Sequence, residues 1–581
     1  MNNNEKWERR AIPESWDEND SLTCYLKLEG LVTELPVVKE LAESRRNIRI
    51  MFNDGGIDTN KVYPEVYNQA VDIVIDAIRN KRRIVISGDY DVDGMTATAA
   101  LYICIRHVGG DVDWAIPSRE HDGYGMNYAK ISSKCKEHSL IISVDNGIAC
   151  NDVIAKLYAD GHTVLVTDHH LAEGKILPTC ECILDPKVFM KPEDDEYMAS
   201  GCYLSAKLGN LIYQKMTGRF NPDLMNYLDA VVGLSIISDM IDLNPTMMYQ
   251  LRCGLAALGN TSHAGLRALL SMSGYRDGIN LNSTFIGMMV SPKLNAAGRM
   301  DNVDAGMQIL LKETDTSSGN VDSMILANSL KALNTSRKLI EVQIVTEAYN
   351  QIEEYVGTDI QKIPAGLVAY GPEWKSGVLG IVAARLVDIF RVPVIVLSGT
   401  GDSIHGSGRS PEGGDLYGAM NDCADILTQF GGHKAAGGCS LLRKDLDAFR
   451  AKFAKVLEEK DRQENVRYYD GKVTIPNLHD LRFQQFMYGV EPTGKGNEPV
   501  SLLLADVWVV NVNKARDTTY ISVVDRNTNT NIVVSKYRCS EEWTAANLIS
   551  TNIDVLISPN VTYWNGVTSP EYKIISLKAH E

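Results

Sequence analysis

The sequence predicts an α/β protein with a parallel-sheet domain, a long helix, a second and smaller α/β domain, and a C-terminal β-barrel. Three observations lead to this fold class. Short apolar runs that end in polar residues alternate with helical stretches in the first part of the chain, which is typical of a parallel sheet. A stretch with few helix breakers follows at 316–356. From about residue 466, alternating runs joined by polar turns indicate a small antiparallel barrel.

The composition is that of a large folded protein with an acidic surface. The chain has 581 residues, of which 44% are apolar, and a net charge of −16. Local arginines and bound metal ions can still recognise phosphate on such a protein. The 11 cysteines include no CxxC pair, so we expect free thiols and no zinc site.

We expect a cytoplasmic protein with no membrane contact. No apolar run approaches the roughly 18 residues of a membrane span. The start, MNNNEKWERR, is polar and lacks the apolar core of a signal peptide.

The first domain begins with a helix near 64–80, because PEVYNQAVDIVIDAIRN places apolar residues at helical spacing after a proline. From residue 83 the pattern becomes strand, acidic loop and helix, in RRIVISGDYD and GMTATAALYICIRHVGG. Four further strands are expected in DVDWAIP (111–117), LIISVDNG (140–147), HTVLVTDHH (162–170) and CILDPK (182–187), with a helix at 150–161. The polar residues gather at the carboxyl ends of these strands, where open α/β sheets bind ligands.

The remaining segments complete the predicted organisation. Residues 200–310 are mostly helical in pattern, and 316–356 is expected to form one helix that bridges two lobes. The second α/β unit runs from GLVAYGPEW to about 460 and contains the glycine-rich segments IHGSGRSPEGG and FGGHKAAGG. The expected domains are 1–315, the bridging helix 316–356, 357–462 and 463–581.

Four acidic or imidazole clusters fall at the ends of predicted strands: DYDVD (89–93), VDNG (144–147), TDHH (167–170) and ISDM (237–240). Carboxylate oxygens with imidazole nitrogens suit Mn²⁺ or Mg²⁺, and the absence of thiolates argues against zinc or iron–sulfur. Such a ligand set is large enough for two metal ions, which together catalyse phosphoryl transfer. The predicted metal ligands are Asp89, Asp91, Asp93, Asp145, His169, His170 and Asp239.

An isolated aspartate at a strand end more often caps a helix or forms a turn. Asp168 could have that role, or it could orient a histidine. Four clusters at the same edge of one sheet are much harder to explain as caps, so we favour the metal interpretation.

GDYDVDG, VDNG, VTDHH and SDMI resemble the four motifs of the DHH phosphoesterase superfamily. Within it, the chain is most similar to the RecJ branch of single-stranded DNA exonucleases. The similar segments are PSREHDGYG (117–125), SPKLNAAGRMDN (291–302), LNTSR (333–337), WKSGVLGIVAARL (374–386), GSGRS (406–410) and FGGHKAAGG (430–438). The resemblance spans about 40–460 and continues weakly at PTGKGNEPV (492–500). It implies a DHH domain, a DHHA1 domain and an OB-like β-barrel for the three predicted domains.

The resemblance also implies roles for individual residues. Asp93, Asp145, His169 and His170 are expected to be catalytic, with Asp145 bridging the metals. The residues expected to bind substrate are Arg119, Arg299, Ser407, Arg409 and His433. Of these, Arg119, Ser407 and Arg409 match a pocket for the 5′-terminal phosphate, and a planar guanidinium pairs well with phosphate. Arg299 could instead cap a turn, and Asn334 and Arg337 could make local ion pairs instead of lining the DNA path.

The implied activity is a processive or semi-processive 5′→3′ exonuclease on single-stranded DNA, with two Mn²⁺ or Mg²⁺ ions and 5′-mononucleotides as products. It would serve DNA repair, recombination or replication. Single-stranded DNA is the expected partner of a monomer, with a single-strand-binding protein or a helicase as further partners. Two alternatives stay open: a hydrolase of short oligonucleotides or cyclic dinucleotides, and a catalytically silent replication scaffold.

The chain departs from the family pattern at two places. Lys375 stands where a histidine usually follows the tryptophan, so a histidine's role there would be lost. The terminal region is divergent and acidic. Its aromatic residues Tyr520, Tyr537, Trp543 and Trp564 could stack on bases, but we expect most of them in the barrel core.

Overall fold

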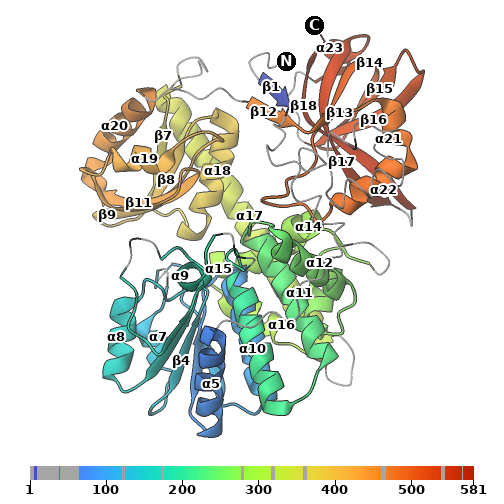
Figure 1. Ribbon diagram of the computed structural model, residues 1–581. Coiled ribbons are helices and arrows are strands. Elements are labelled where there is room, and N and C mark those ends of the chain that lie inside the picture. Colours follow the sequence, from blue (N-terminus) through green and yellow to red (C-terminus); the bar gives the residue numbers. More distant parts are fainter. Residues whose placement is uncertain are drawn as a thin grey trace.

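The first sheet of the computed structural model, to which the strand labelled β4 in Figure 1 belongs, has five parallel strands in the order β3-β2-β4-β5-β6. They are β2 (Ile84–Ser87), β3 (Val112–Ala115), β4 (Leu140–Val144), β5 (Thr163–Thr167) and β6 (Cys182–Leu184). The predicted parallel sheet is therefore confirmed. The structure describes residues 6–9, 38, 65–120, 122–123, 125–172, 174, 176–192, 194, 196–276, 281–315, 321–356, 363–459, 466–537, 543–564 and 567–580.

Helices cover both faces of this sheet. Side chains alternate along a strand, so Ile84 and Ile86 pack into the core on one face and Val85 into the core on the other. Burial on both faces explains why the strands are continuous apolar runs. The flanking helices are α5 (Glu65–Arg79), α6 (Val92–His107), α7 (Tyr128–Ser132), α8 (Asn151–Ala159) and α9 (Pro186–Phe189).

A helical layer completes this first lobe, which we define as α5 to α16. As expected for residues 200–310, it consists almost entirely of helices. They are α10 (Gly201–Thr217), α11 (Pro222–Ser238), α12 (Pro245–Gly259), α13 (Ala264–Met272), α14 (Ser283–Phe285), the π-helical turn η1 (Ile286–Val290), α15 (Ser291–Arg299) and α16 (Val303–Leu310).

The long helix α17 (Val321–Val356) connects the first lobe to a second one (Figure 1). It packs on α13, α15 and α16 at one end and on α18 and β7 at the other. The second lobe, β7 to α20, has a mixed sheet in the order β10-β11-β9-β8-β7. Its elements are β7 (Leu367–Gly371), η3 (Ser376–Val378), α18 (Leu379–Phe390), β8 (Val394–Ser398), β9 (Ser403–Arg409), α19 (Leu416–Asn421), β10 (Leu427–Gly432), β11 (Ala436–Leu442), η4 (Arg443–Asp445) and α20 (Leu446–Glu458).

None of the helices in the described part of the chain is long and apolar enough to cross a membrane.

The two glycine-rich segments of the second lobe lie mostly in strands. Segment 406–409 belongs to β9, which pairs with β8 on one side and β11 on the other. A Cβ atom on Gly406 would lie 2.0 Å from the carbonyl oxygen of Val396. Glycine is used here because the strands approach closely.

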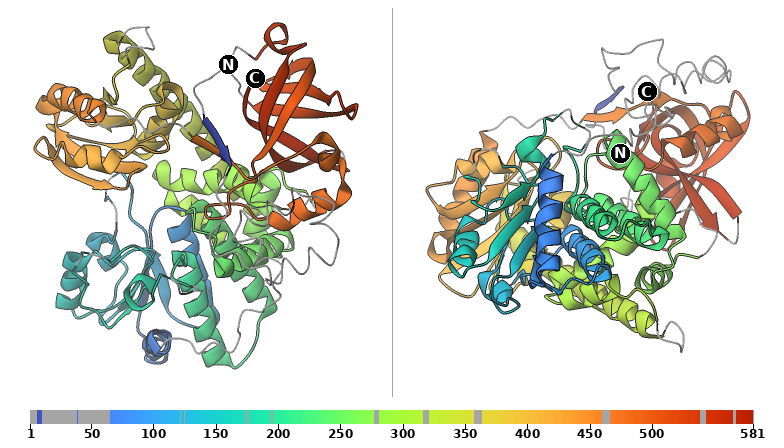
Figure 2. Two further views of the ribbon diagram at one scale, coloured as in Figure 1. Left: turned by 45° about the horizontal axis from the view of Figure 1, so that its top comes forward. Right: turned by 60° about the horizontal axis from the view of Figure 1, so that its bottom comes forward.

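The C-terminal domain contains the predicted β-barrel, closed by pairing of β14 with β17 in a ring of five strands, β14-β15-β16-β18-β17. The likeness to the OB fold stays a prediction. Figure 2 shows the short β1 beside β12, with which it pairs. The elements are β1 (Lys6–Arg9), β12 (Val466–Tyr469), β13 (Gly471–Lys472), α21 (Ile475–His479), α22 (Leu481–Val490), β14 (Leu502–Ala515), β15 (Thr518–Asp525), β16 (Thr530–Tyr537), α23 (Ala545–Leu548), β17 (Asn552–Trp564) and β18 (Val567–Ala579).

The aromatic residues of this domain are less buried than expected. Tyr520 and Tyr537 are 39% and 60% exposed, so the core assignment is wrong for both. Alternate side chains of β15 and β16 face away from the barrel interior, and these two tyrosines occupy such outward positions. Trp543 is partly buried against the barrel core. The side chain of Trp564 lies outside the described residues.

We predict that Gly254→Ala destabilises the first lobe by about 1–3 kcal/mol, because it overpacks the crossing of α11 and α12. A Cβ atom on Gly254 would lie 2.6 Å from the Cα of Gly233 and 2.7 Å from the carbonyl oxygen of Asp229. Denaturant unfolding measures the change. Gly259→Ala in the same helix is the control, because its nearest atom would be 3.5 Å away, and its stability should be unchanged or slightly higher. Equal stabilities of the two variants would contradict this packing argument.

Candidate metal centre and anion site

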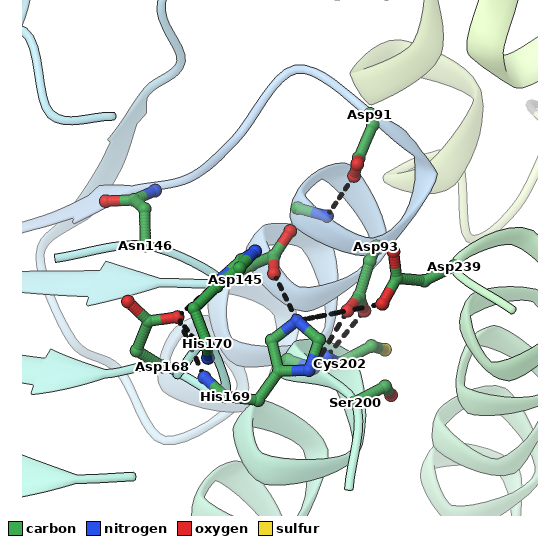
Figure 3. A network of polar contacts seen from close by, with 12 residues as sticks. Asp91, Asp93, Asp145, Asn146, Asp168, His169, His170, Ser200, Cys202 and Asp239 are labelled. Atoms are coloured by element: carbon green, nitrogen blue, oxygen red, sulfur yellow. Dashed lines mark hydrogen bonds and ion pairs between the residues drawn. The ribbon is translucent and has the colours of Figure 1, made fainter. Parts of the chain in front are cut away.

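The structure brings all seven predicted metal ligands to one place, at the carboxyl edge of the first sheet. Asp239, expected at the end of a strand, instead follows the helix α11, so that prediction is wrong for the ISDM cluster. The seven residues form three overlapping groups whose ligand atoms lie within 4.8 Å of one another. The groups are Asp89, Asp91 and Asp145; Asp145, His169 and His170; and Asp93, His169 and Asp239. Figure 3 shows His169 between Asp145 on one side and Asp93 with Asp239 on the other. Asp145 and His169 each belong to two groups. The carboxylate of Asp145 can bridge two ions, whereas the neutral imidazole of His169 can bind one ion of the pair.

The loop after β2 and the start of α6 supply three of the carboxylates. Asp89 lies two residues after the end of the buried strand β2, and Asp91 caps α6 by accepting a hydrogen bond from the Gly94 N–H at 3.0 Å. Asp93 lies in the first turn of the same helix. The tight turn requires Gly94, because a Cβ atom there would lie 2.5 Å from the backbone oxygen of Asp89.

Asp145 follows β4 with a left-handed backbone (φ 59°), which is uncommon for a residue with a side chain. The start of α10 packs against it: a Cβ atom on Gly201 would lie 2.7 Å from the Asp145 Cβ. Only glycine allows that approach. A backbone outlier of this kind, held by close packing, is typical of a functional site.

Asp93 is held by groups that the sequence analysis did not identify. Its carboxylate accepts hydrogen bonds from the backbone N–H groups of Gly201 and Cys202, both at 2.8 Å, and from the Ser235 hydroxyl at 2.6 Å. Ser235 also contacts the hydroxyl of Ser200, the N-cap of α10. The N-terminus of a helix stabilises a negative charge. The signal in the sequence is weak, since Ala-Ser-Gly-Cys could begin any helix.

Asp168 holds the imidazole of His170. Its Oδ1 atom accepts hydrogen bonds from the backbone N–H of His169 at 2.8 Å and from His170 Nδ1 at 2.7 Å, and its Oδ2 atom accepts one from the Ile148 N–H at 2.9 Å. Burial alone would raise the pKa of Asp168, but these bonds and the charge of His170 lower it. Asp168 therefore fits the second role considered above, that of a residue that orients a histidine.

The other carboxylates are short of positive partners. Burial and the neighbouring aspartates raise the pKa of Asp89 and of Asp145 well above the ordinary value of 3.8, and they raise that of Asp239 to about 8. Burial lowers the pKa of His169, so its imidazole is neutral and suited to bind a metal ion. For His170, burial works in the same direction, but the bond to Asp168 outweighs it and raises the pKa to about 9.

The residues fit a pair of divalent cations. The Oδ1 atom of Asp89 and the Nε2 atom of His169 are both buried and make no hydrogen bond, although His169 Nε2 lies 3.0 Å from Asp145 Oδ1. Buried polar atoms without partners are rare and costly. Oxygen and imidazole ligands without thiolate match Mn²⁺ and Mg²⁺.

Next to this centre, arginines from both lobes come together. Arg119 lies over the ring of Tyr90, 5.2 Å from its centroid, and Tyr90 separates two of the metal-site aspartates. Arg299 is half-buried and donates to the Gly377 carbonyl of the second lobe at 3.1 Å. Burial and the charges of Arg119, Arg337 and Arg409 lower the pKa of Arg299 to about 10.

The second lobe contributes Ser407 and Arg409 from β9. Arg409 Nη1 donates to the Ser407 hydroxyl at 3.0 Å. A Cβ atom on Gly380, in the first turn of α18, would lie 2.8 Å from Arg409 Nη2 and 3.0 Å from Ser407 Oγ. A guanidinium beside a helix N-terminus places two positive groups together, which an anion stabilises. Side chains of β9 and the start of α18 therefore make this a candidate anion site.

Other predicted site residues lie elsewhere or have local partners. His433 is exposed in the turn between β10 and β11, where its backbone N–H donates to the Ala436 carbonyl. Arg337 bonds to Asn334 at 3.2 Å and pairs with Glu341 on the same helix, which is the local ion pair considered above. The residue that departs from the family pattern, Lys375, pairs with Glu120 at 2.6 Å.

Two protein-family models match the chain. The DHH family, N-terminal domain, matches residues 83–232, and the DHHA1 domain matches residues 364–459. These ranges cover the first sheet with its helices and the second lobe.

Curated relatives and solved structures agree with these matches. The chain is 33% identical over 473 residues to the single-stranded-DNA-specific exonuclease RecJ of Dickeya dadantii, covering 76% of this chain and 77% of the relative. It is 27% identical to RecJ of Bacillus subtilis, covering 96% of this chain and 69% of the relative. The crystal structure of Thermus thermophilus RecJ with Mn²⁺ has a TM-score of 0.77 at 21% identity, over 100% of this chain and 80% of that one. A structure of exonuclease RecJ bound to manganese has a TM-score of 0.56 at 26% identity, over 68% and 95%.

We predict that Mn²⁺ raises the melting temperature more at about pH 8.5 than at about pH 6, because at lower pH the metal must displace protons. Asp239 shows how the stability of the metal-free protein changes with pH. Its pKa in the folded protein is about 8 against an ordinary 3.8, so without metal its stabilising contribution is complete below the ordinary value and is lost as the pH rises through about 8. Ionisation at high pH thus leaves a repulsion that Mn²⁺ relieves. Calorimetry with EDTA or Mn²⁺ measures the gain.

The control separates the metal centre from other buried acids. Asp239→Asn should reduce the Mn²⁺-dependent gain and its dependence on pH. Asp229→Asn, on the same helix, removes an acid whose pKa burial raises to about 6 but which belongs to none of the three groups, and it should leave the gain unchanged. A gain that is equal at both pH values would contradict the prediction.

Proposed function

Because the chain belongs to the RecJ family of single-stranded-DNA-specific exonucleases, we propose that it is a metal-dependent exonuclease that degrades single-stranded DNA from the 5′ end. The products are 5′-mononucleotides. One observation carries this proposal: a centre of five carboxylates and two imidazoles lies directly beside a cluster of arginines that faces it from both lobes. Cations and phosphate are the ligands that these two groups of charges require.

The carboxylates and imidazoles at the sheet edge would hold two divalent cations. Bound there, Mn²⁺ or Mg²⁺ would lower the pKa of a water molecule and stabilise negative charge on the phosphate that is attacked. The catalytic residues in this proposal are Asp93, Asp145, His169 and His170. Asp93 keeps its position through the N-terminus of α10, and Asp168 fixes the ring of His170, so the ligands are preorganised before substrate binds.

The anion site explains why degradation would start at a 5′ end. Arg119 from the first lobe and Ser407 with Arg409 from the second would bind the terminal phosphate, and Arg299 would bind a phosphate further along the strand. An arginine can hold a phosphate through two parallel hydrogen bonds. His433 would face the strand from the hairpin of the second lobe.

We further propose that the protein works as a cytoplasmic monomer together with a single-strand-binding protein or a helicase. Single-stranded DNA is short-lived in cells unless another protein produces or holds it, so an enzyme specific for it needs such a supplier. Its role would lie in DNA repair, recombination or replication.

We predict that Asp145→Asn and His169→Ala each lower the hydrolysis of single-stranded DNA at least a thousandfold, because each residue belongs to two of the three ligand groups. The assay compares 5′- and 3′-labelled oligonucleotides with Mn²⁺, Mg²⁺ or EDTA and identifies the products. Asp447→Asn is the control, since its side chain is 93% exposed on the second lobe. Near wild-type activity in both site variants would contradict the assignment, and release of dinucleotides or activity only on very short substrates would favour the alternative hydrolase.

We predict that Arg409→Ala weakens binding of 5′-phosphorylated single strands about tenfold or more, while binding of 5′-hydroxyl strands changes much less. The reason is the loss of a charge-assisted contact to the terminal phosphate. The measurement is the KM for matched oligonucleotides that differ only in the 5′ group. An equal rise in KM for both substrates would show that Arg409 does not recognise the end.

A further inference from the structure

One ion pair joins the two lobes beside the arginine cluster. Lys375 Nζ lies 2.6 Å from Glu120 Oε2, although the residues are 255 positions apart in the chain. Lys375 comes directly before η3 in the second lobe, and Glu120 lies in a turn after β3 in the first lobe. The side chains of Lys375 and Glu120 are 24% and 38% exposed. A pair this exposed contributes little to overall stability. Its interest lies in its location between the two lobes.

The lysine end is fixed within the second lobe. The neighbouring Trp374 donates from its indole Nε1 to Glu347 of α17 at 2.7 Å, and Ser376 Oγ bonds to His405 Nε2 of β9 at 2.9 Å. Trp374 is therefore tied to the part of α17 that packs on the second lobe, and Ser376 is tied to a strand of that lobe. The position of the ammonium group follows the position of that lobe.

The glutamate end belongs to the turn that carries Arg119. The turn is closed by a hydrogen bond from the Ser118 N–H to the Asp122 carboxylate at 2.7 Å and by one from the Asp122 N–H to the Ser118 carbonyl at 2.9 Å. The Ser118 hydroxyl also contacts Asp301. Arg119 directly precedes Glu120, so a force on Glu120 acts on the arginine through one peptide unit.

The arginines of the two lobes repel one another in the absence of an anion. Burial and the charge of Arg119 lower the pKa of Arg409. The second effect reflects repulsion between an arginine of the first lobe and one of the second lobe. The contact of Arg299 with Gly377 holds the lobes together at one point. The ion pair of Lys375 with Glu120 is a second contact between the lobes, and it lies next to Arg119 in the sequence.

We propose that the Lys375–Glu120 ion pair is an inter-lobe clasp that sets the spacing between Arg119 and Arg409 and thereby the preference for 5′-phosphorylated ends. The proposal rests on the proposed function, in which these arginines bind the terminal phosphate. Both members of the clasp are positioning residues. The competing explanation is that Lys375 binds the phosphate itself and that Glu120 only weakens its charge.

Glu120→Gln separates the two explanations. Removing a negative charge beside an anion site should strengthen phosphate binding by simple electrostatics. The clasp predicts the opposite, because Lys375 loses its partner and the turn with Arg119 is released. We expect the ratio of KM for 5′-phosphate to KM for 5′-hydroxyl strands to rise about threefold, with little change in kcat on the phosphorylated strand. A ratio that falls or stays constant overturns the clasp.

Charge exchange gives the second test. Lys375→Glu places two carboxylates together and should raise the same ratio about tenfold, whereas Lys375→Arg keeps the charge and should retain the wild-type ratio. The double variant Lys375→Glu with Glu120→Lys should return the ratio to within about twofold of wild type. Failure of this double variant to recover, with the melting temperature preserved, overturns the clasp.

The controls distinguish the clasp from the function on which it rests. Lys452→Glu replaces a surface ion pair with Asp425, inside the second lobe, by two like charges. This variant should leave the KM ratio unchanged. A wild-type protein that cleaves and prefers 5′-phosphate ends, combined with unchanged ratios in the Glu120 and Lys375 variants, overturns the clasp alone. A wild-type protein that cleaves neither substrate overturns the proposed function and the clasp with it.

Discussion

Carboxylates crowd together and repel one another at the edge of the first sheet. The fold stabilises two of these acids by itself: Asp93 lies at the N-terminus of α10, and Asp168 is bonded to His170. It does not do so for Asp89, Asp145 and Asp239, whose pKa values are raised by burial and by the neighbouring aspartates. When these groups ionise, the protein keeps an electrostatic cost that bound cations remove, and this cost favours metal binding.

The metal centre and the anion site differ in how they use the two lobes. Every candidate metal ligand comes from the first lobe. The arginines come from both, since Arg119 and Arg299 belong to the first lobe and Arg409 to the second. The proposed catalytic centre therefore lies within one lobe, whereas the proposed recognition of the strand end would depend on how the lobes meet. A substitution between the lobes would then change which ends are selected without changing metal binding.

Most of the first lobe could be predicted because its signals are local or follow from strand direction. The acidic clusters each end a parallel strand or a helix of one layer, and parallel strands bring their carboxyl ends to the same edge. The contacts of Asp93 with Gly201 and Cys202 could not be predicted, because nothing in those residues marks a carboxylate partner far away in the sequence. Glycine in β9 gave a misleading signal, since it is equally frequent where a loop turns and where strands approach closely. Lys375 and Glu120 each look like ordinary surface charges until the lobes are placed side by side.

The C-terminal domain also reaches the metal centre, through the segment that precedes the barrel. The N–H of Leu243 donates to the Lys495 carbonyl at 2.8 Å, and a Cβ atom on Gly496 would lie 2.0 Å from the carboxylate of Asp242. This turn of the first lobe directly follows Asp239 at the end of α11. The positive charge of Lys495 opposes the rise in the pKa of Asp239. Because the turn after Asp239 is bonded to Lys495, residues more than two hundred positions away help to position this candidate metal ligand.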